Sequence, residues 1–474
     1  MLRVGLANQR QHATRNTQHA TSINQHNPTW NLNRFTPLIT FLCAFTIYAA
    51  TTPTSLTWAN HGADGGELIT AALTGGIPHP PGYPTYLLLG RLISWLPFGS
   101  AAYRFNLFSG LCTAGAAAFL TAIAQTGWKD SHTHKRPWLF SIAAGLTFAF
   151  MPLIWSQAII TEVYGLNLLL LSATLWAVYA HKPATIVGLL CGVALTTHLT
   201  SALILPLLFF TRPPRDWPQL SGGVLLGLTP FLLLFFRAQN ISPVMWGDGR
   251  TLSGWWWLIS AQIYRPNLFS APNSLIWHRL TSWPLGLATQ LGYLGWLILP
   301  YYFLRHRPPR QSALSLLPLL ATAALYALYA LTYDAVDAAV FALPALLLLN
   351  IALIHLLQPA PIPVLFLPLL LLTLNLNYFS TRLDHRDASA KTVLAFQQLP
   401  EQAIVLTSGG GLTTFTLWYF QHVEKNRSDL VVVDSDLFAF DWYRANLRRL
   451  YPTLYHVEQD DLPRFTEGTL PQRP

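Results

Sequence analysis

The chain has 474 residues, of which 52% are hydrophobic and only 10% are charged, and its formal net charge is +9. Soluble domains carry about 25% charged residues, so this composition excludes an ordinary water-soluble protein. The basic residues lie in short loops between apolar blocks, which argues against a nucleic-acid-binding face. The three cysteines, Cys43, Cys112 and Cys191, lie inside apolar segments, so no disulfide framework is expected.

Residues 1–34 are polar and contain no acidic residue, and we interpret them as a disordered cytoplasmic tail. After the tail, residues 35–380 are expected to form an α-helical polytopic membrane domain of about eleven spans, because ~18 or more apolar residues suffice to cross a bilayer. The fifth and sixth apolar blocks are short, and they predict either one kinked helix or a tight pair of helices. The blocks fall near 35–53, 106–125, 138–156, 164–180, 184–198, 199–211, 220–237, 284–304, 312–332, 338–357 and 362–380.

The distribution of Lys and Arg predicts the orientation of these spans. With the N-terminus placed inside, the tail and the inner loops hold 13 basic residues and the outer loops hold six. Basic residues accumulate on the cytoplasmic side of membrane proteins, so this excess favours a cytoplasmic N-terminus. An odd number of spans then places the C-terminus outside.

The first outer segment, residues 54–105, predicts two short helices joined by a rigid turn. Residues 67–74 and 86–96 have helical patterns, and the second is amphipathic, so we expect both helices to lie on the outer leaflet. The proline-rich run at 78–84 cannot continue a helix. In the second outer segment, 238–283, several tryptophans fit an aromatic belt at the interface and also fit a wall for a sugar or lipid chain.

Carboxylates are rare before residue 381, and most of them map to the predicted outer side. Acidic groups near a membrane are costly to desolvate and are usually functional, although any single one could merely solvate a loop. Their accumulation on one side therefore indicates a site there. The six outer acids are Asp64, Glu67, Glu162, Asp248, Asp334 and Asp337.

Residues 381–474 differ in composition and predict a small soluble α/β domain outside the membrane. Strands are expected at 403–407 and 430–433, and helices at 412–423 and 439–450, in the order β-α-β-α. The triple glycine at 409–411 could cradle a phosphate, but without a nucleotide-binding signature a plain turn is the better interpretation.

Asp64 and Glu67 are the strongest candidates for chemistry. Their spacing places both on one face of a helix, and glycosyl transfer needs a carboxylate that accepts the proton of the attacking hydroxyl. The alternative is purely structural: Asp64 caps the helix and Glu67 completes a capping box. A departing phosphate needs a cation, and Arg91, Arg104 or His198 could supply it.

Several motifs resemble one family of bacterial and eukaryotic membrane proteins, which includes a protein O-mannosyltransferase of the vertebrate endoplasmic reticulum. The usual D-S-G-E of its signature has Gly65 in place of the serine. The matching stretches are Asp64-Gly65-Gly66-Glu67 with His79-Pro80-Pro81-Gly82-Tyr83-Pro84, Thr161 to Asn167, Thr197-His198, Trp246-Gly247-Asp248, Tyr333-Asp334 through Asp337, Leu417-Trp418-Tyr419 and Arg427-Ser428-Asp429.

This family resembles the GT-C glycosyltransferases, which are multi-span enzymes with an essential acid in the first outer loop, the position of Asp64. The resemblance implies inverting transfer of mannose or a related hexose from a polyprenyl-phosphate donor to a hydroxyl of a protein or glycan. We expect this on the outer face of the plasma (inner) membrane, with no nucleic-acid partner and no certain cofactor. Dependence on a divalent metal is left open.

Asp64 and Glu67 are thus the expected catalytic residues. A transporter or flippase of lipid-linked saccharides is the main alternative, but the inverted repeats expected of it are not visible. A non-catalytic scaffold would have no reason to gather acids beside a rigid turn. The residues expected to bind substrate are His79, Tyr83, Arg91, Arg104, Glu162, His198, Trp246, Asp248, Asp334 and Asp337.

Overall fold

A computed structural model forms two compact units, Met1–Phe35 and Thr36–Pro474. In the first unit, only the short 3-10 helix η1 (Leu32–Arg34) and Phe35 are described, so most of the predicted tail lies outside the described residues. Everything below concerns the second unit. The described residues are 32–128, 137–305, 310–357, 361–381, 388–408 and 412–452.

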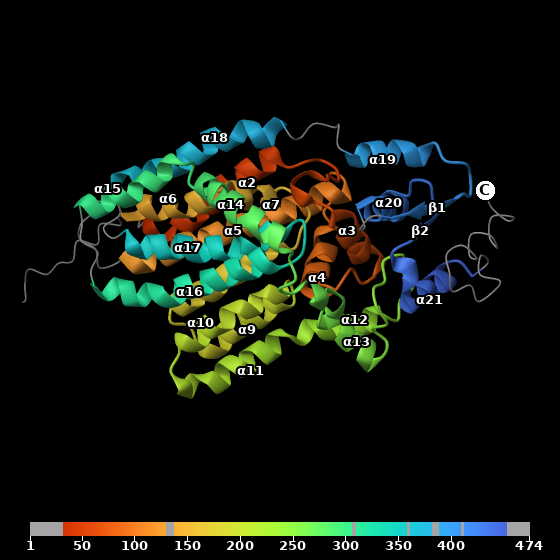
Figure 1. Cartoon of the computed structure of the whole chain (residues 1–474), viewed down its shortest axis with the longest axis horizontal. Coiled ribbons are helices and arrows are strands. Elements are labelled where there is room, and N and C mark those ends of the chain that lie inside the picture. The colour runs from red at the N-terminus through yellow and green to blue at the C-terminus, as the bar shows by residue number, and fades with distance from the viewer. Residues whose placement is uncertain are drawn as a thin grey trace, which may run out of the picture. The chain divides into compact units, whose positions relative to one another are not determined.

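The second unit is built mostly of apolar helices that run alongside one another (Figure 1). The helices before residue 240 are α2 (Thr36–Thr51), α3 (Gly65–Thr74), α4 (Pro84–Ile93), α5 (Ala101–Trp128), α6 (Pro137–Phe150), α7 (Pro152–Ala158), α8 (Tyr164–Tyr179), α9 (Ala184–Leu195), α10 (Leu205–Phe210), α11 (Trp217–Gly227) and α12 (Leu232–Arg237). Those after it, up to the C-terminal module, are α13 (Leu252–Ile259), α14 (Asn273–Gln290), α15 (Ile298–Arg305), α16 (Arg310–Thr332), α17 (Leu343–Leu356) and α18 (Leu367–Thr381).

Within the described residues, four helical segments are long and apolar enough to cross a membrane: Ala101–Thr126, Pro214–Arg237, Ala338–Leu356 and Ile362–Ser380. The second and fourth have only 28% of their most apolar window buried, so their apolar side chains face outward, as expected toward lipid. The pair α6 and α7 bends by 70° at its break and would be a fifth span. The multi-pass character is therefore clear, while the number of eleven spans stays a prediction.

Five shorter apolar helices overlap further predicted blocks: Thr36–Thr51, Tyr164–Tyr179, Ala184–Leu195, Leu199–Phe210 and Leu316–Thr332. The two short blocks near residue 198 form separate pieces. Helix α9 ends at Leu195, and the backbone at His198 is extended. The 3-10 helix η3 (Leu199–Ile204) then begins and leads directly into α10.

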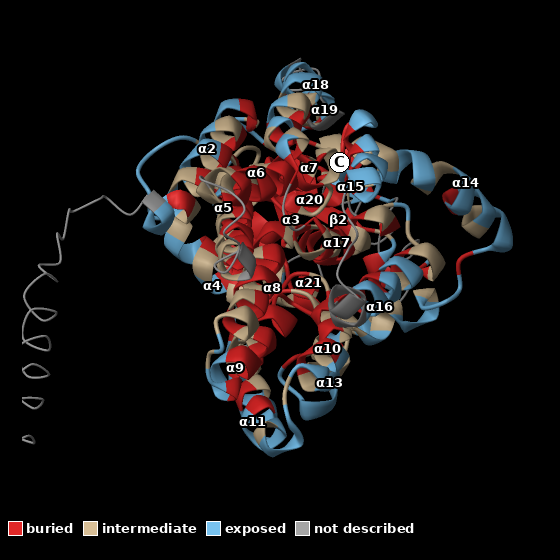
Figure 2. Ribbon diagram, turned by 90° about the vertical axis from the view of Figure 1, so that its left-hand side faces the viewer, coloured by how far each residue is buried: buried red, intermediate tan, exposed pale blue. Residues whose placement is uncertain are grey.

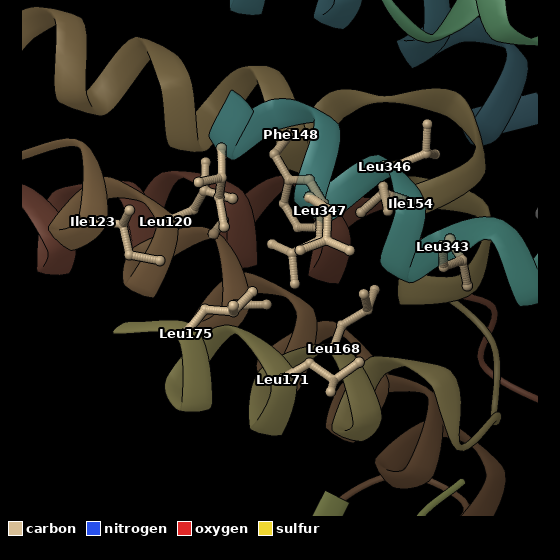
Figure 3. Packing of buried hydrophobic residues seen from close by; sticks show 14 of the residues in the cluster. Leu120, Ile123, Phe148, Ile154, Leu168, Leu171, Leu175, Leu343, Leu346 and Leu347 are labelled. Atoms are coloured by element: carbon tan, nitrogen blue, oxygen red, sulfur yellow. The ribbon is translucent and has the colours of Figure 1, made fainter. Parts of the chain in front are cut away.

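A large apolar core holds the long helices together. Figure 3 shows Leu120 of α5, Phe148 of α6, Leu171 of α8 and Leu347 of α17 converging, and all four are buried. Facing side chains from four helices exclude both water and lipid here, so this bundle forms the rigid frame of the molecule.

Helices α9 and α11 pack closely because each presents a pair of glycines four residues apart. A Cβ atom at Gly192 would overlap the backbone of α11, and one at Gly227 would overlap the backbone of α9. Gly188 and Gly223 meet the opposite helix in the same way. Small residues at this spacing let two membrane helices approach until their backbones touch.

The C-terminal module contains α19 (Ala388–Gln397), β1 (Ile404–Thr407), α20 (Leu412–His422), β2 (Val431–Asp434) and α21 (Asp441–Leu450), in the predicted order. The strands are parallel, with Ile404 opposite Val431 and Thr407 opposite Asp434. The predicted turn at 409–411 lies outside the described residues.

The module shares one hydrophobic core with the first outer segment. Leu68 of α3 and Phe105 of α5 belong to the same buried cluster as Trp418 and Val432. In Figure 1 the module lies next to α3, and the two helices α3 and α20 contact each other directly. That residues 381–474 constitute a separate extracytoplasmic domain therefore stays a prediction.

Helix α3 differs from the surface helix expected from the sequence. Every residue from Gly65 to Ala72 is buried, and α3 lies deep inside the ribbon in Figure 2. The reason is that α20, which lies far along the chain, packs directly against α3. Helix α4 fits the prediction better, since Leu88 and Leu92 are exposed.

Candidate active site

A cavity of about 990 Å³ opens beside the N-terminus of α3. Its lining combines the first outer segment, the loop before α8, the second outer segment, the loop between α16 and α17, and the C-terminal module. Seven of the residues expected at the site line it: Asp64, His79, Tyr83, Glu162, His198, Trp246 and Asp337.

Asp64 occupies the N-cap position of α3, but its side chain makes no capping hydrogen bond. Its carboxylate is 33% exposed and faces the cavity. Glu67 does not complete a capping box either, because its carboxylate instead accepts from the backbone N–H of His79 at 3.1 Å. The two side chains therefore do not form the helix cap and capping box that were the structural alternative for this pair.

His79 links the two acids. Its Nδ1 lies 2.5 Å from Glu67 Oε2, and its Nε2 lies 3.6 Å from Asp64 Oδ2. The Tyr83 hydroxyl also lies 2.7 Å from Nε2. Glu67 is fully buried, whereas Asp64 lines the cavity, so of the two acids it is Asp64 that a ligand in the cavity can reach.

The electrostatic balance around His79 favours the imidazolium. Burial lowers the pKa of His79, but the carboxylates of Glu67 and Asp64 more than offset this and raise it to about 9. Burial raises the pKa of Glu67, and the His79 cation opposes that rise. At neutral pH a fixed positive charge therefore stands beside Asp64.

Aromatic rings surround the imidazole of His79. The centroids of Tyr83, Trp246 and Tyr264 lie 5.0, 6.2 and 6.2 Å from its own, each in an edge-to-face arrangement. Trp246 is buried and lines the cavity, so it belongs to the site wall rather than to an exposed interfacial belt.

Glu162 is a second buried acid of the cavity. Burial raises its pKa well above the ordinary value, and the charges of Asp64 and Asp337 add to the rise. Its loop is tied to α5, because the Ser109 hydroxyl donates to the backbone carbonyl of Glu162 at 3.3 Å. The raised pKa means that Glu162 takes up a proton more readily than an exposed glutamate does.

Asp337 enters the cavity from the loop between α16 and the 3-10 helix η8 (Ala338–Ala342). Burial, followed by the charge of Asp64, raises its pKa. Arg279 of α14 holds the segment before it by donating to four backbone carbonyls, those of Ala330, Leu331, Tyr333 and Ala335, at 2.6 to 3.3 Å.

His198 lines the cavity on the side of the spans. It sits between the rings of Tyr164 and Phe341, with centroid distances of 5.5 and 5.6 Å. Its Nδ1 lies 2.7 Å from the Thr200 hydroxyl, so Nε2 is the nitrogen left to face a ligand. Its proposed contact with phosphate stays a prediction.

Four expected substrate-binding residues are not brought into the cavity. Arg91 donates to the carbonyl of Leu73, and Arg104 donates to carbonyls at residues 96, 98 and 99. Asp248 pairs with Arg250 at 2.7 Å, and Asp334 is exposed outside the cavity. Their roles in substrate binding stay predictions that the geometry does not support.

The structure adds residues that sequence reasoning missed. Arg265, on the 3-10 helix η6 (Gln262–Asn267), lines the cavity and donates to the Ser260 hydroxyl at 3.1 Å. Asp436 and Phe440 line the cavity from the C-terminal module, and nothing in the local sequence indicated that they would meet Asp64.

Among the described residues, no three or more His, Cys, Asp or Glu side chains are grouped so that they could hold a metal ion. The carboxylates of the cavity are instead organised around His79. Metal dependence stays open as a question for assay.

Two parts of the chain match profiles of one protein family. Residues 64–218 match the profile described as Protein O-mannosyl-transferase TMEM260 N-terminal domain, and residues 386–455 match TMEM260-associated domain 2. The family resemblance inferred from the motifs is thus confirmed. The first match begins at Asp64, and the second covers the module that closes the cavity.

Curated relatives include Protein O-mannosyl-transferase TMEM260 of Mus musculus, 33% identical over 45% of this chain and 32% of the relative. The protein of the same name from Dictyostelium discoideum is 26% identical over 54% of this chain and 35% of the relative. The chain thus spans about a third of the length of the curated relatives it matches.

The fold resembles that of one solved structure, in which the protein is bound to a lipid phosphate. The crystal structure of ArnT from Cupriavidus metallidurans bound to undecaprenyl phosphate superposes with a TM-score of 0.58, over 88% of this chain and 94% of that one. The identity is 13%, so this likeness concerns the fold alone. It confirms the expected GT-C-like architecture.

Proposed function

From this family resemblance we propose that the chain is an inverting membrane glycosyltransferase. It moves mannose or a related hexose from a polyprenyl-phosphate donor to a hydroxyl acceptor, in the first place a Ser or Thr of a protein. The names of the relatives support the sugar and the acceptor. The fold shared with an undecaprenyl-phosphate-bound protein supports the lipid-linked donor.

One observation carries the proposal: Asp64 stands uncapped in the cavity, at the position of the essential acid in the resemblance. A carboxylate released from helix capping keeps its lone pairs for a substrate proton. Burial raises the pKa of Glu162 and of Asp337, whereas the carboxylate of Asp64 is one-third exposed at the cavity, so we assign Asp64 as the base.

The reaction follows from this arrangement. Asp64 accepts the proton of the acceptor hydroxyl while that oxygen attacks the anomeric carbon of the donor. The bond between this carbon and the phosphate oxygen breaks, and the lipid phosphate leaves with the electron pair. Attack opposite the leaving group inverts the anomeric centre. The imidazolium of His79 and the guanidinium of Arg265 are the cavity cations placed to balance the phosphate charge.

Asp64 and the module lie on the predicted outer side, so transfer is proposed to occur on the outer face of the plasma (inner) membrane. A donor whose lipid tail stays in the bilayer would enter from the side of the spans, where Tyr329 and Phe341 line the cavity.

The test uses purified protein with radiolabelled polyprenyl-phosphate mannose and a mixture of Ser/Thr peptides. We expect label on peptide with wild-type protein and none above background with Asp64→Asn. Labelled lipid that crosses the bilayer of proteoliposomes, without transfer to any acceptor, would instead overturn the enzyme proposal in favour of a flippase.

A further inference from the structure

The cavity has two chemically different walls, one on each side of the start of α3. One wall comes from the spans and includes Leu203, Tyr329 and Phe341. The other comes from the C-terminal module and includes Asp436 and Phe440. In Figure 1 the helical bundle and the module lie on opposite sides of α3, which Asp64 directly precedes as the N-cap residue.

The module presents its ligand-binding edge to this cavity. In sheets of parallel strands, ligands bind beyond the carboxyl ends of the strands, where the following loops converge. Strand β2 ends at Asp434, and Asp434, Asp436 and Leu437 line the cavity. Leu412, the first residue of α20, follows β1 and lines it as well. The cavity therefore lies at the edge where a small α/β unit binds ligands.

This edge is held rigidly. The carboxylate of Asp434 accepts from the Thr414 hydroxyl at 2.5 Å and from the backbone N–H groups of Asp436 and Leu437 at 3.0 and 2.9 Å. The Tyr443 hydroxyl accepts from the backbone N–H of Asp434 at 2.9 Å. The loop that carries Asp436 is thus fixed before any ligand arrives, and Asp434 itself is fully used in holding it.

The volume leaves room for a second substrate. Cavities of roughly 300–1,000 Å³ enclose most of a drug-sized ligand, and this cavity of about 990 Å³ lies at the upper end of that range. A hexosyl phosphate against the wall of the spans would leave the space beside the module unfilled.

We propose that the carboxyl edge of the module is the acceptor subsite, where Asp436 and Phe440 bind the polypeptide segment that carries the acceptor hydroxyl. This inference rests on the proposed function and assigns a role to the module. Phe440 offers an apolar surface to the flanking side chains of the segment. Asp436 selects against acidic flanking residues, because its exposed carboxylate would repel theirs.

Asp436 is exposed, so its substitution by Asn tests selectivity without disturbing the core. The assay compares two Ser/Thr peptides that differ only in Asp or Asn beside the acceptor, with radiolabelled polyprenyl-phosphate mannose as donor. We expect wild-type protein to use the Asn peptide roughly tenfold better in kcat/KM, as one close like-charge contact would give. Asp436→Asn should remove most of that preference.

A pair of variants on the two walls separates donor from acceptor. Phe440→Ala should raise the acceptor KM several-fold and leave the donor KM and the slow hydrolysis of donor by water unchanged. The control variant Phe341→Ala, on the wall formed by the spans, should raise the donor KM and leave the acceptor KM unchanged.

The outcomes distinguish this inference from the proposed function. If wild-type protein neither transfers nor hydrolyses the donor, the proposed function fails and the inference fails with it. If transfer occurs but Asp436→Asn keeps the full peptide preference, or Phe440→Ala changes only the donor KM, the acceptor subsite lies elsewhere. Label that appears only on a glycan acceptor would also overturn the assignment of a polypeptide.

Discussion

At the scale of single residues, the proposed chemistry depends on Asp64, whose side chain makes no capping hydrogen bond. Asp64→Asn keeps a side chain that can cap α3, and the native carboxylate makes no capping bond, so the melting temperature should change little. Loss of a general base should lower the transfer rate by ~10²–10⁴-fold. The measurement is kcat of the folded variant, compared with Asp216→Asn, an acid outside the cavity. Near wild-type turnover in Asp64→Asn would remove the catalytic role.

His79 should give the stability of the protein a distinct pH dependence. Its folded pKa of about 9 lies above the ordinary 6.5, so the folded state binds this proton more tightly. The stabilisation is fully present below pH 6.5 and is lost as the pH rises through about 9. A rise of this size corresponds to about 3 kcal/mol.

The measurement for His79 is the melting temperature of wild type and His79→Gln between pH 6 and 10. We expect a decline in wild type that His79→Gln lacks, because the glutamine cannot lose a proton in this range. Parallel curves for the two proteins would show that the histidine does not carry the extra proton.

Residue types and spacing predicted part of the site. The three-residue spacing of Asp64 and Glu67 predicted that the two acids share one face of a helix. In the structure both lie beside His79 of the following turn, and their catalytic roles stay predictions. The sequence could not show that Arg91 would donate to the carbonyl of Leu73 near the end of α3. The partner of an arginine depends on which carbonyls the tertiary fold leaves without another donor. The same reason hid Arg265, which is indistinguishable from other outer arginines until the cavity forms.

At the scale of elements, the contact between α3 and α20 depends on one glycine. A Cβ at Gly66 would overlap the backbone carbonyl of Phe415, and neither helix backbone can give way cheaply. We therefore expect Gly66→Ala to cost about 1–3 kcal/mol, as overpacking of a filled core does, and to loosen the C-terminal module.

Gly65→Ala is the matched control for Gly66→Ala. Its added Cβ would meet side-chain atoms of Thr161 and Leu56 at 3.2 and 3.3 Å, which small shifts relieve. Limited proteolysis near residues 398–402, together with the melting temperature, should separate the two variants. Equal behaviour of the two alanines would mean that the close approach of α3 and α20 is not required.

The helices and strands themselves were largely predictable. The apolar, β-branched runs of the C-terminal module predicted both strands to within about one residue of 404–407 and 431–434. Such short runs between turns rarely form anything other than a strand. The environment of α3 was not predictable, since the element that buries it lies hundreds of residues later. Helices α6 and α7 bend by 70° at Met151, and Pro152 is the first residue of α7. A hydropathy average over a window of residues does not reveal such a bend.

At the scale of the whole molecule, orientation is the property most open to test. The excess of Lys and Arg predicts a cytoplasmic N-terminus and an outer C-terminus. A reporter active only in the cytoplasm, fused after Pro474, should give no signal, whereas the same reporter fused at Lys182 should be bright. A bright signal from the first fusion would mean that the number of spans is even.

The close packing of α20 on α3 also sets an order of assembly. Asp64 emerges from the ribosome early, whereas the wall that holds Asp436 and Phe440 is synthesised after every predicted span. A nascent or truncated chain that lacks this wall would have its acid facing an open membrane surface, with water as the nearest nucleophile. Under the proposed function, chains that lack this wall should at most hydrolyse the donor slowly rather than glycosylate bystander proteins.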